Sequence, residues 1–199
     1  MEHEQYLQAG MHIGMKQQTK QMKKFIYKTR EDGLAVLDLQ TIDQRIKLAA
    51  NFLSNFKSIM VVSRKVVGQK PASKFAEAIN GKAIVGRFLP GIITNPDFPG
   101  YFEPDVIIIT DPLVDKQAMV EAVKMRIPVI ALCDTFNETN LIDLIIPVNN
   151  KGRKSLAMLY YTLAKEILKS KNVIASDSDF KFKIEEFEAK EQEVREEKE

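Results

Sequence analysis

The stretch DVIIIT, at residues 105–110, sets four branched apolar residues in a row between an aspartate and a threonine. Three comparable runs lie around it: SIMVVS (58–63), KAIVGRF (82–88) and PVIALCD (128–134). Strands with one solvent-facing side alternate apolar and polar residues, whereas these runs do not, so both of their faces must be covered. Helical stretches near residues 71–80 and 115–126 alternate with the runs. The pattern predicts a parallel sheet with helices packed on it.

The flanking segments extend this sheet. LIDLIIPV (141–148) predicts a last strand, followed by a helix over about 152–170. In the other direction, residues 41–56 predict a helix with Thr41 as its N-cap. The expected buried face of that helix is Ile42, Ile46, Ala49, Ala50 and Leu53. Before it, FIYKT and LAVLDL flank REDG (30–33), which suits a tight hairpin turn at Asp32 and Gly33. The fold class is therefore α/β, a doubly wound sandwich of about five parallel strands with an attached β-hairpin.

Composition favours one folded domain with two extensions. The chain has 199 residues, 45% of them hydrophobic, which is enough for one core. We divide it into a basic N-terminal arm (1–24), an α/β domain (25–172) and a charged, acidic C-terminal tail (173–199). Cys133 has no partner for a disulfide, which favours the reducing cytoplasm. No apolar stretch approaches the roughly 18 residues of a membrane span, and we expect no signal peptide.

Charge is distributed unevenly along the chain. Residues 185–199 hold eight Glu against three Lys or Arg, a net charge of −5, so the rest carries +7 when the whole chain carries +2. Residues 5–30 contain six basic side chains and no acidic one. A basic block of this kind suits a polyanion such as RNA, although a solvated surface has the same composition. From Asp177 onward, a solvated helix and a disordered tail fit the sequence equally well.

The sequence lacks the catalytic and nucleotide-binding motifs of common enzymes. Asp111 and Asp134 follow neighbouring strands and could hold Mg²⁺, or they could cap turns and helices. Neither GxGxxG nor GxxxxGK[ST] occurs. His3 and His12 both lie in the arm, outside any Ser or Cys triad, and two His with one Cys argue against a zinc site. We expect no catalytic residue, no cofactor, no metal and no small-molecule substrate. A magnesium-dependent phosphate-ester enzyme using Asp111 and Asp134 is the alternative.

Three segments are suited to RNA. NNKGRKS (149–155) joins a strand to a helix and combines amides, cations and the positive end of the helix dipole. The arm interleaves lysines with Gln, Thr and aromatic residues that can contact bases or pack on the core. GRFLPGIITNP (86–96) is a stiff loop with a single cation. The candidate RNA-binding residues are His12, Lys16, Lys20, Lys23, Lys24, Lys28, Arg30, Arg87, Asn95, Asn149, Asn150, Lys151, Arg153, Lys154 and Ser155.

Six ordered segments resemble those of a known family. They are AGMHIG (9–14), FIYKTREDGLAVLDL (25–39), GRFLPGIITNP (86–96), EPDVIIITDP (103–112), EAVKMRIPVIALCDT (121–135) and LIDLIIPVNNKGRKSL (141–156). Together they resemble protein two of the small ribosomal subunit, in its archaeal and eukaryotic branch, also called SA or laminin-receptor-like. Met15 departs from bacterial relatives, which often carry a second histidine there, so no role of that histidine is carried over.

The resemblance implies a flavodoxin-like fold and a noncatalytic protein that binds small-subunit ribosomal RNA and neighbouring ribosomal proteins. It implies contacts through His12 to Lys24, Arg87 to Asn95, and Asn149 to Ser155. The resemblance implies no partner for the acidic tail. A third hypothesis is an adaptor whose tail recruits a basic partner.

Overall fold

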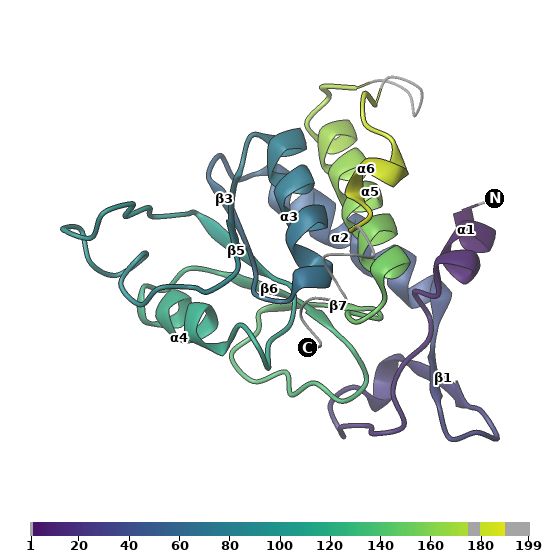
Figure 1. Cartoon of the computed structure of the whole chain (residues 1–199). Helices are drawn as coiled ribbons and strands as arrows, with labels where there is room; N and C mark the ends of the chain where they lie inside the picture. The colour runs from purple at the N-terminus through teal and green to yellow at the C-terminus, as the bar shows by residue number, and fades with distance from the viewer. Residues whose placement is uncertain (1, 175–179, 190–199) are drawn as a thin grey trace.

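In the computed structural model, which describes residues 2–174 and 180–189, a sheet of five parallel strands forms the centre (Figure 1). The strands are β3 (Ile59–Ser63), β4 (Lys82–Val85), β5 (Val106–Ile109), β6 (Val129–Cys133) and β7 (Leu144–Pro147). Their order is β4-β3-β5-β6-β7, which is the flavodoxin-like arrangement. The three central strands are buried along their whole length, whereas the edge strands are only partly buried. The expected fold class is confirmed.

Helices cover both faces of the sheet. On one face α2 (Leu39–Ser54), α3 (Val66–Ile79) and α5 (Arg153–Ser170) pack together, while α4 (Lys116–Lys124) lies on the other side against β5 and β6 (Figure 1). All five apolar residues expected on the buried face of α2 are buried. Its N-cap is Asp38 and not Thr41, because the Asp38 carboxylate accepts hydrogen bonds from the backbone N–H of Gln40 and Thr41.

Helix α3 begins earlier than the sequence suggested. It starts at Val66, five residues before the expected start at 71, and it contains Pro71. Proline is usual in the first turn of a helix, where its missing N–H costs nothing, but Pro71 is the sixth residue of α3. Gly68 permits the early turn to lie against the sheet, because a Cβ there would come within 2.4 Å of the Ser63 Oγ and 2.9 Å of the Thr110 methyl.

The N-terminal segments form a small antiparallel sheet that packs on the domain. The hairpin of β1 (Ile26–Thr29) and β2 (Ala35–Leu37) is present, and Gly33 occupies its turn with a positive φ of 84°. Residues 12–15 pair with β2 on its other side, through Leu37 N–H to His12 O, Gly14 N–H to Ala35 O and Ala35 N–H to Met15 O. The arm also forms α1 (Glu2–Ala9) and η1 (Lys23–Phe25), and Tyr6, Met11 and Met22 are buried. The basic arm is thus part of the folded core.

The C-terminal segment is also docked. Helix α6 (Ile184–Phe187) lies against α3 and α5, and Phe187 is fully buried. Phe180 and Phe187 both pack edge-on to Tyr161 of α5. Both sequence interpretations of the tail are therefore wrong for residues 180–189, which are neither a solvated helix nor disordered. Residues 175–179 and 190–199 lie outside the described residues.

Candidate nucleic-acid interface

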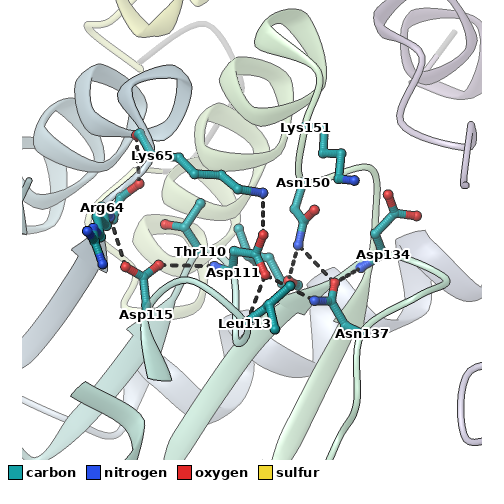
Figure 2. Close-up of polar contacts among 12 residues, drawn as sticks. Arg64, Lys65, Thr110, Asp111, Leu113, Asp115, Asp134, Asn137, Asn150 and Lys151 are labelled. Carbon is teal, nitrogen blue, oxygen red and sulfur yellow. Dashed lines mark hydrogen bonds and ion pairs between the residues drawn. The ribbon is translucent and has the colours of Figure 1, made fainter. Parts of the chain in front are cut away.

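A polar network fills the edge of the sheet where the chain leaves β3 and β5 (Figure 2). The connections after these neighbouring strands run to opposite faces, and flavodoxin-like folds bind ligands in the crevice that results. Here the Asp111 carboxylate, which is buried, forms an ion pair with Lys65. Its Oδ1 also accepts hydrogen bonds from Asn137 Nδ2 and the Leu113 N–H, both at 3.0 Å. The crevice therefore holds the protein's own side chains.

Asn137 connects this ion pair to the loops beyond β6 and β7. Its Oδ1 accepts a hydrogen bond from the Asp134 N–H at 2.8 Å and another from Asn150 Nδ2 at 3.1 Å. Asn150 Nδ2 also donates to the Leu132 carbonyl at 3.0 Å. Loops that follow three different strands are thereby fixed to one another.

Asp115 completes the network on the β3 side. Its carboxylate accepts hydrogen bonds from the backbone N–H of Arg64 at 2.9 Å and of Asp111 at 3.2 Å. Burial raises the pKa of Asp115 to about 6, and the two backbone donors oppose that shift. Asp115 therefore holds the segment after β3 against the segment after β5.

The two aspartates of the enzyme hypothesis have structural partners. Asp134 accepts a hydrogen bond from the Thr135 N–H at 2.6 Å, and burial raises the pKa of its carboxyl group. Asp111 is held by Lys65, Leu113 and Asn137 as described. Within residues 2–174 and 180–189, no group of three or more His, Cys, Asp or Glu side chains is arranged to hold a metal ion. Both carboxylates thus act in turns, which was one of their two interpretations from sequence.

The turn 149–155 uses most of its polar side chains internally. Asn150 and Ser155 are buried, and the Ser155 hydroxyl donates to the Asn149 carbonyl at 2.7 Å. Asn149 Oδ1 accepts hydrogen bonds from the N–H groups of Lys151 and Gly152, both at 3.0 Å. Asn150 and Ser155 are therefore poorly placed for the RNA contact expected of them, since they shape the turn from inside.

The cations of this turn differ in their surroundings. Lys151 is exposed, with its Nζ 4.1 Å from the centroid of the Phe136 ring, and Lys154 is also exposed. Arg153 Nε lies 2.9 Å from Glu188 Oε1 of the C-terminal segment. Lys151 and Lys154 are thus the cations of the turn that face solvent.

Sequence reasoning overlooked two cations beside this turn. Arg64 and Lys65 follow β3, and with Lys151 they line one surface hollow above the polar network. Their signal was present in the sequence as the dipeptide RK directly after the buried run SIMVVS. Figure 2 shows Lys65 reaching from this side toward Asp111.

The basic arm and the turn lie side by side. The Asn149 N–H donates to the Met11 carbonyl at 3.0 Å, and Asn149 Nδ2 donates to the Gly10 carbonyl at 3.1 Å. Further along, the Met15 N–H donates to Thr135 Oγ1 at 2.9 Å, and the Thr19 N–H to the Thr135 carbonyl at 2.9 Å. The exposed cations of the arm and hairpin are Lys16, Lys20, Lys23, Lys24, Lys28 and Arg30.

His12 lies between the arm and the hairpin. Its side chain is half-buried, and its buried Nδ1 has no hydrogen-bond partner in the described part of the chain. Burial lowers the pKa of His12, and the nearby Arg30 lowers it further. His12 is therefore neutral near pH 7.

The loop 86–96 lies apart from these segments. Phe88, Ile92 and Ile93 are buried, and the Gly91 N–H donates to the Glu121 carboxylate of α4. Arg87 and Asn95 are exposed. Figure 1 shows the hairpin and this loop at opposite ends of the molecule, so the structure joins the arm to the turn but not to the loop.

Comparison with known proteins agrees with this arrangement. A family model described as Ribosomal protein S2 matches residues 6–98 and 101–170. The chain belongs to the ribosomal protein S2 family. The match covers the sheet, the arm from Tyr6 onward and the turn. The ribosomal protein S2 family is structural and non-enzymatic, which leaves the phosphate-ester hypothesis without support.

Relatives within the S2 family are similar over most of the chain. A protein of Ignicoccus hospitalis called small ribosomal subunit protein uS2 is 52% identical over 94% of this chain and 91% of its own length. Relatives with the same name are 49% identical in Methanoregula boonei, over 91% of both chains, and 48% identical in Haloquadratum walsbyi. The last match covers 94% of this chain and 66% of the relative. All three organisms are archaea, which fits the branch named by the resemblance.

None of the helices in residues 2–174 and 180–189 combines the length and the apolar character needed to cross a membrane.

Proposed function

We infer that this chain is a structural component of the small ribosomal subunit. Its partners are ribosomal RNA and neighbouring ribosomal proteins, and it acts in the cytoplasm. The names of its S2-family relatives support this assignment. The filled crevice supports it as well, because Lys65, Asp111 and Asn137 occupy the place where a flavodoxin-like fold takes a ligand.

We propose that RNA docks on one continuous surface, here called the arm–turn surface. It consists of the exposed cations Lys16, Lys20, Lys23, Lys24, Lys28, Arg30, Lys151 and Lys154. The observation that carries the proposal is the contact of Asn149 with Gly10 and Met11, because it unites two basic segments that are distant in sequence. A cationic surface held rigid by backbone hydrogen bonds loses little conformational entropy when it meets a folded RNA.

The polar residues of the turn support this surface from behind. Asn149, Asn150 and Ser155 fix the backbone, so that Lys151 projects from a defined loop and Lys154 from the first turn of α5. His12 and Arg153 flank the surface. Arg87 and Asn95 are exposed on the loop 86–96, which lies at the other end of the molecule from the hairpin, so they would make a second and separate contact.

The test is binding of the full-length protein to a transcript of small-subunit ribosomal RNA over a range of salt concentrations. Lys23→Glu with Lys24→Glu should weaken binding strongly and lower the slope of log affinity against log salt by about 2 or more. Lys57→Glu with Lys124→Glu is the matched control, since both lysines are exposed, Lys57 before the start of β3 and Lys124 at the C-terminal end of α4, away from the turn that follows β7. Equal effects of the two double variants would contradict the proposed surface.

A further inference from the structure

A surface hollow lies between α1, the hairpin and the start of α2, beside the arm–turn surface. Its apolar lining includes Leu7 and Val36, and its polar lining includes His12, Tyr27, Lys28 and Arg30. Leu7 is 48% exposed and Tyr27 is 71% exposed, so apolar surface faces solvent here. A ring as exposed as that of Tyr27 contributes little to the core, so it is available to contact a ligand in the hollow.

A β-bulge brings Tyr27 and Lys28 to the same hollow. Ile26 pairs with Leu37 and Lys28 pairs with Val36, so Tyr27 is one extra residue in β1. In a regular strand Tyr27 and Lys28 would point to opposite faces, but the extra residue breaks this alternation. An aromatic ring and a cation therefore line one hollow.

The polar groups of the hollow suit a nucleotide. His12 is half-buried and its Nδ1 is buried without a hydrogen-bond partner among the described residues, and the lowered pKa favours the neutral ring, whose Nε2 can then donate or accept one hydrogen bond. Lys28 forms no ion pair within the described ranges, while Arg30 has only a loose, exposed one with Asp32 at 3.7 Å. Asp38 also lines the hollow, but its carboxylate oxygens accept from the N–H groups of Gln40 and Thr41.

We propose that this hollow binds a single unstacked nucleotide of the RNA. The base stacks on Tyr27, its edge bonds to the imidazole of His12, and the adjoining phosphate lies at Lys28 and Arg30. Single-stranded RNA is commonly recognised through splayed bases on aromatic side chains, with cations on the backbone. The inference rests on the proposed function, because it assigns one contact within the RNA interface.

The test compares variants of the full-length protein in binding the same small-subunit RNA transcript. Tyr27→Ala should weaken binding about 5- to 100-fold without changing the salt slope, because it removes stacking and no charge. Tyr27→Phe should bind within about twofold of the wild type, since the ring remains. His12→Phe should lose about 2- to 10-fold, the effect of one hydrogen bond.

The effect of Lys28 can be told from that of Tyr27 by the salt dependence of binding. Lys28→Ala should lower the salt slope by about 1, whereas Lys124→Ala on α4 should leave it unchanged. Thermal unfolding of each variant checks that the exposed substitutions leave the fold intact. A Tyr27→Ala protein that binds as tightly as the wild type overturns the assignment.

The outcomes separate this inference from the proposed function. If the wild type does not bind the transcript, the proposed function itself fails. If Lys23→Glu with Lys24→Glu weakens binding but Tyr27→Ala does not, the interface stands and the nucleotide pocket is wrong. If Tyr27→Ala binds RNA normally but enters reconstituted subunits poorly, the hollow receives a protein segment, which also overturns the proposal.

Discussion

Lys65 and Asp111 form an ion pair across the gap between the ends of β3 and β5. The Asp111 side chain is 1% exposed and that of Lys65 is 21% exposed, so the pair closes the crevice from its outer side. Asn137 donates to the same carboxylate from the loop after β6. The crevice where a related fold would bind a ligand is therefore used to hold loops together, and the cations Arg64 and Lys151 line the hollow beside it.

Removing Asp111 should destabilise the protein. Asp111→Ala leaves Lys65 without its partner and the Asn137 amide without an acceptor, and a broken buried pair typically costs several kcal/mol. Because Lys65 can reach solvent, we expect a loss of about 2–4 kcal/mol in urea unfolding. Glu77→Ala, which breaks the exposed Lys74–Glu77 pair, should leave the unfolding midpoint nearly unchanged. Similar midpoints for both variants would mean that the network is not structural.

Asp115 predicts a pH dependence of stability. Its pKa is raised from 3.8 to about 6 in the folded protein, so the folded state holds a proton that the unfolded chain releases at lower pH. Stability from this group is present below pH 4 and is lost as the pH rises to about 6. As the pH rises from about 4 to about 6, the wild type should therefore lose unfolding free energy relative to Asp115→Asn, by up to about 1.4 kcal/mol per pH unit. Parallel stability profiles between pH 4 and 7 would contradict the raised pKa.

The sheet could be predicted because its signal is local. Uninterrupted apolar runs such as DVIIIT specify strands, and each run became a strand of the sheet, but the expectation that both faces are covered is wrong for β4, which is an edge strand and only partly buried. Boundaries were less accurate where two local signals competed. Asp38 and Thr41 are both good caps, and Pro71 resembled the first turn of a helix that begins at Val66.

The candidate site could be predicted only in part, because its contacts join distant residues. Nothing in NNKGRKS indicates that Asn150 bonds to Asn137 or that Ser155 is buried. Helix α1 carries a single buried apolar residue, Tyr6, so its sequence has no clear amphipathic pattern. The docking of Phe187 on α5 likewise depends on tertiary contact and not on the charge-rich sequence around it.

Gly14 should be essential for joining the arm to the domain. A Cβ at this position would lie 2.5 Å from Thr135 Cγ2 and 3.2 Å from the Ala35 carbonyl oxygen. Gly14→Ala should therefore cost about 1–3 kcal/mol and weaken RNA binding without removing a charge. Thr135→Ser removes the closest methyl and keeps the hydroxyl, so the double variant should recover part of both losses. If the double variant is no better than the single one, the crowding at Thr135 is not the cause.

Phe187 should control docking of the C-terminal segment. Phe187→Ala removes a fully buried ring from the contact with Tyr161, so we expect residues 180–189 to detach while the sheet stays folded. Trypsin should then cut faster at Lys181 and Lys183. Ile184→Ala is the control, because Ile184 is 38% exposed and its removal should leave the cleavage rate close to that of the wild type. Unchanged cleavage in Phe187→Ala would show that other contacts hold the segment.

The most direct test of the central claim is lysine acetylation of the protein, free and in assembled small subunits, read out by mass spectrometry. If the arm–turn surface meets ribosomal RNA, Lys16, Lys20, Lys23, Lys24, Lys151 and Lys154 become protected on assembly. Labelling of these six lysines at the same rate in the particle as in the free protein would contradict the account.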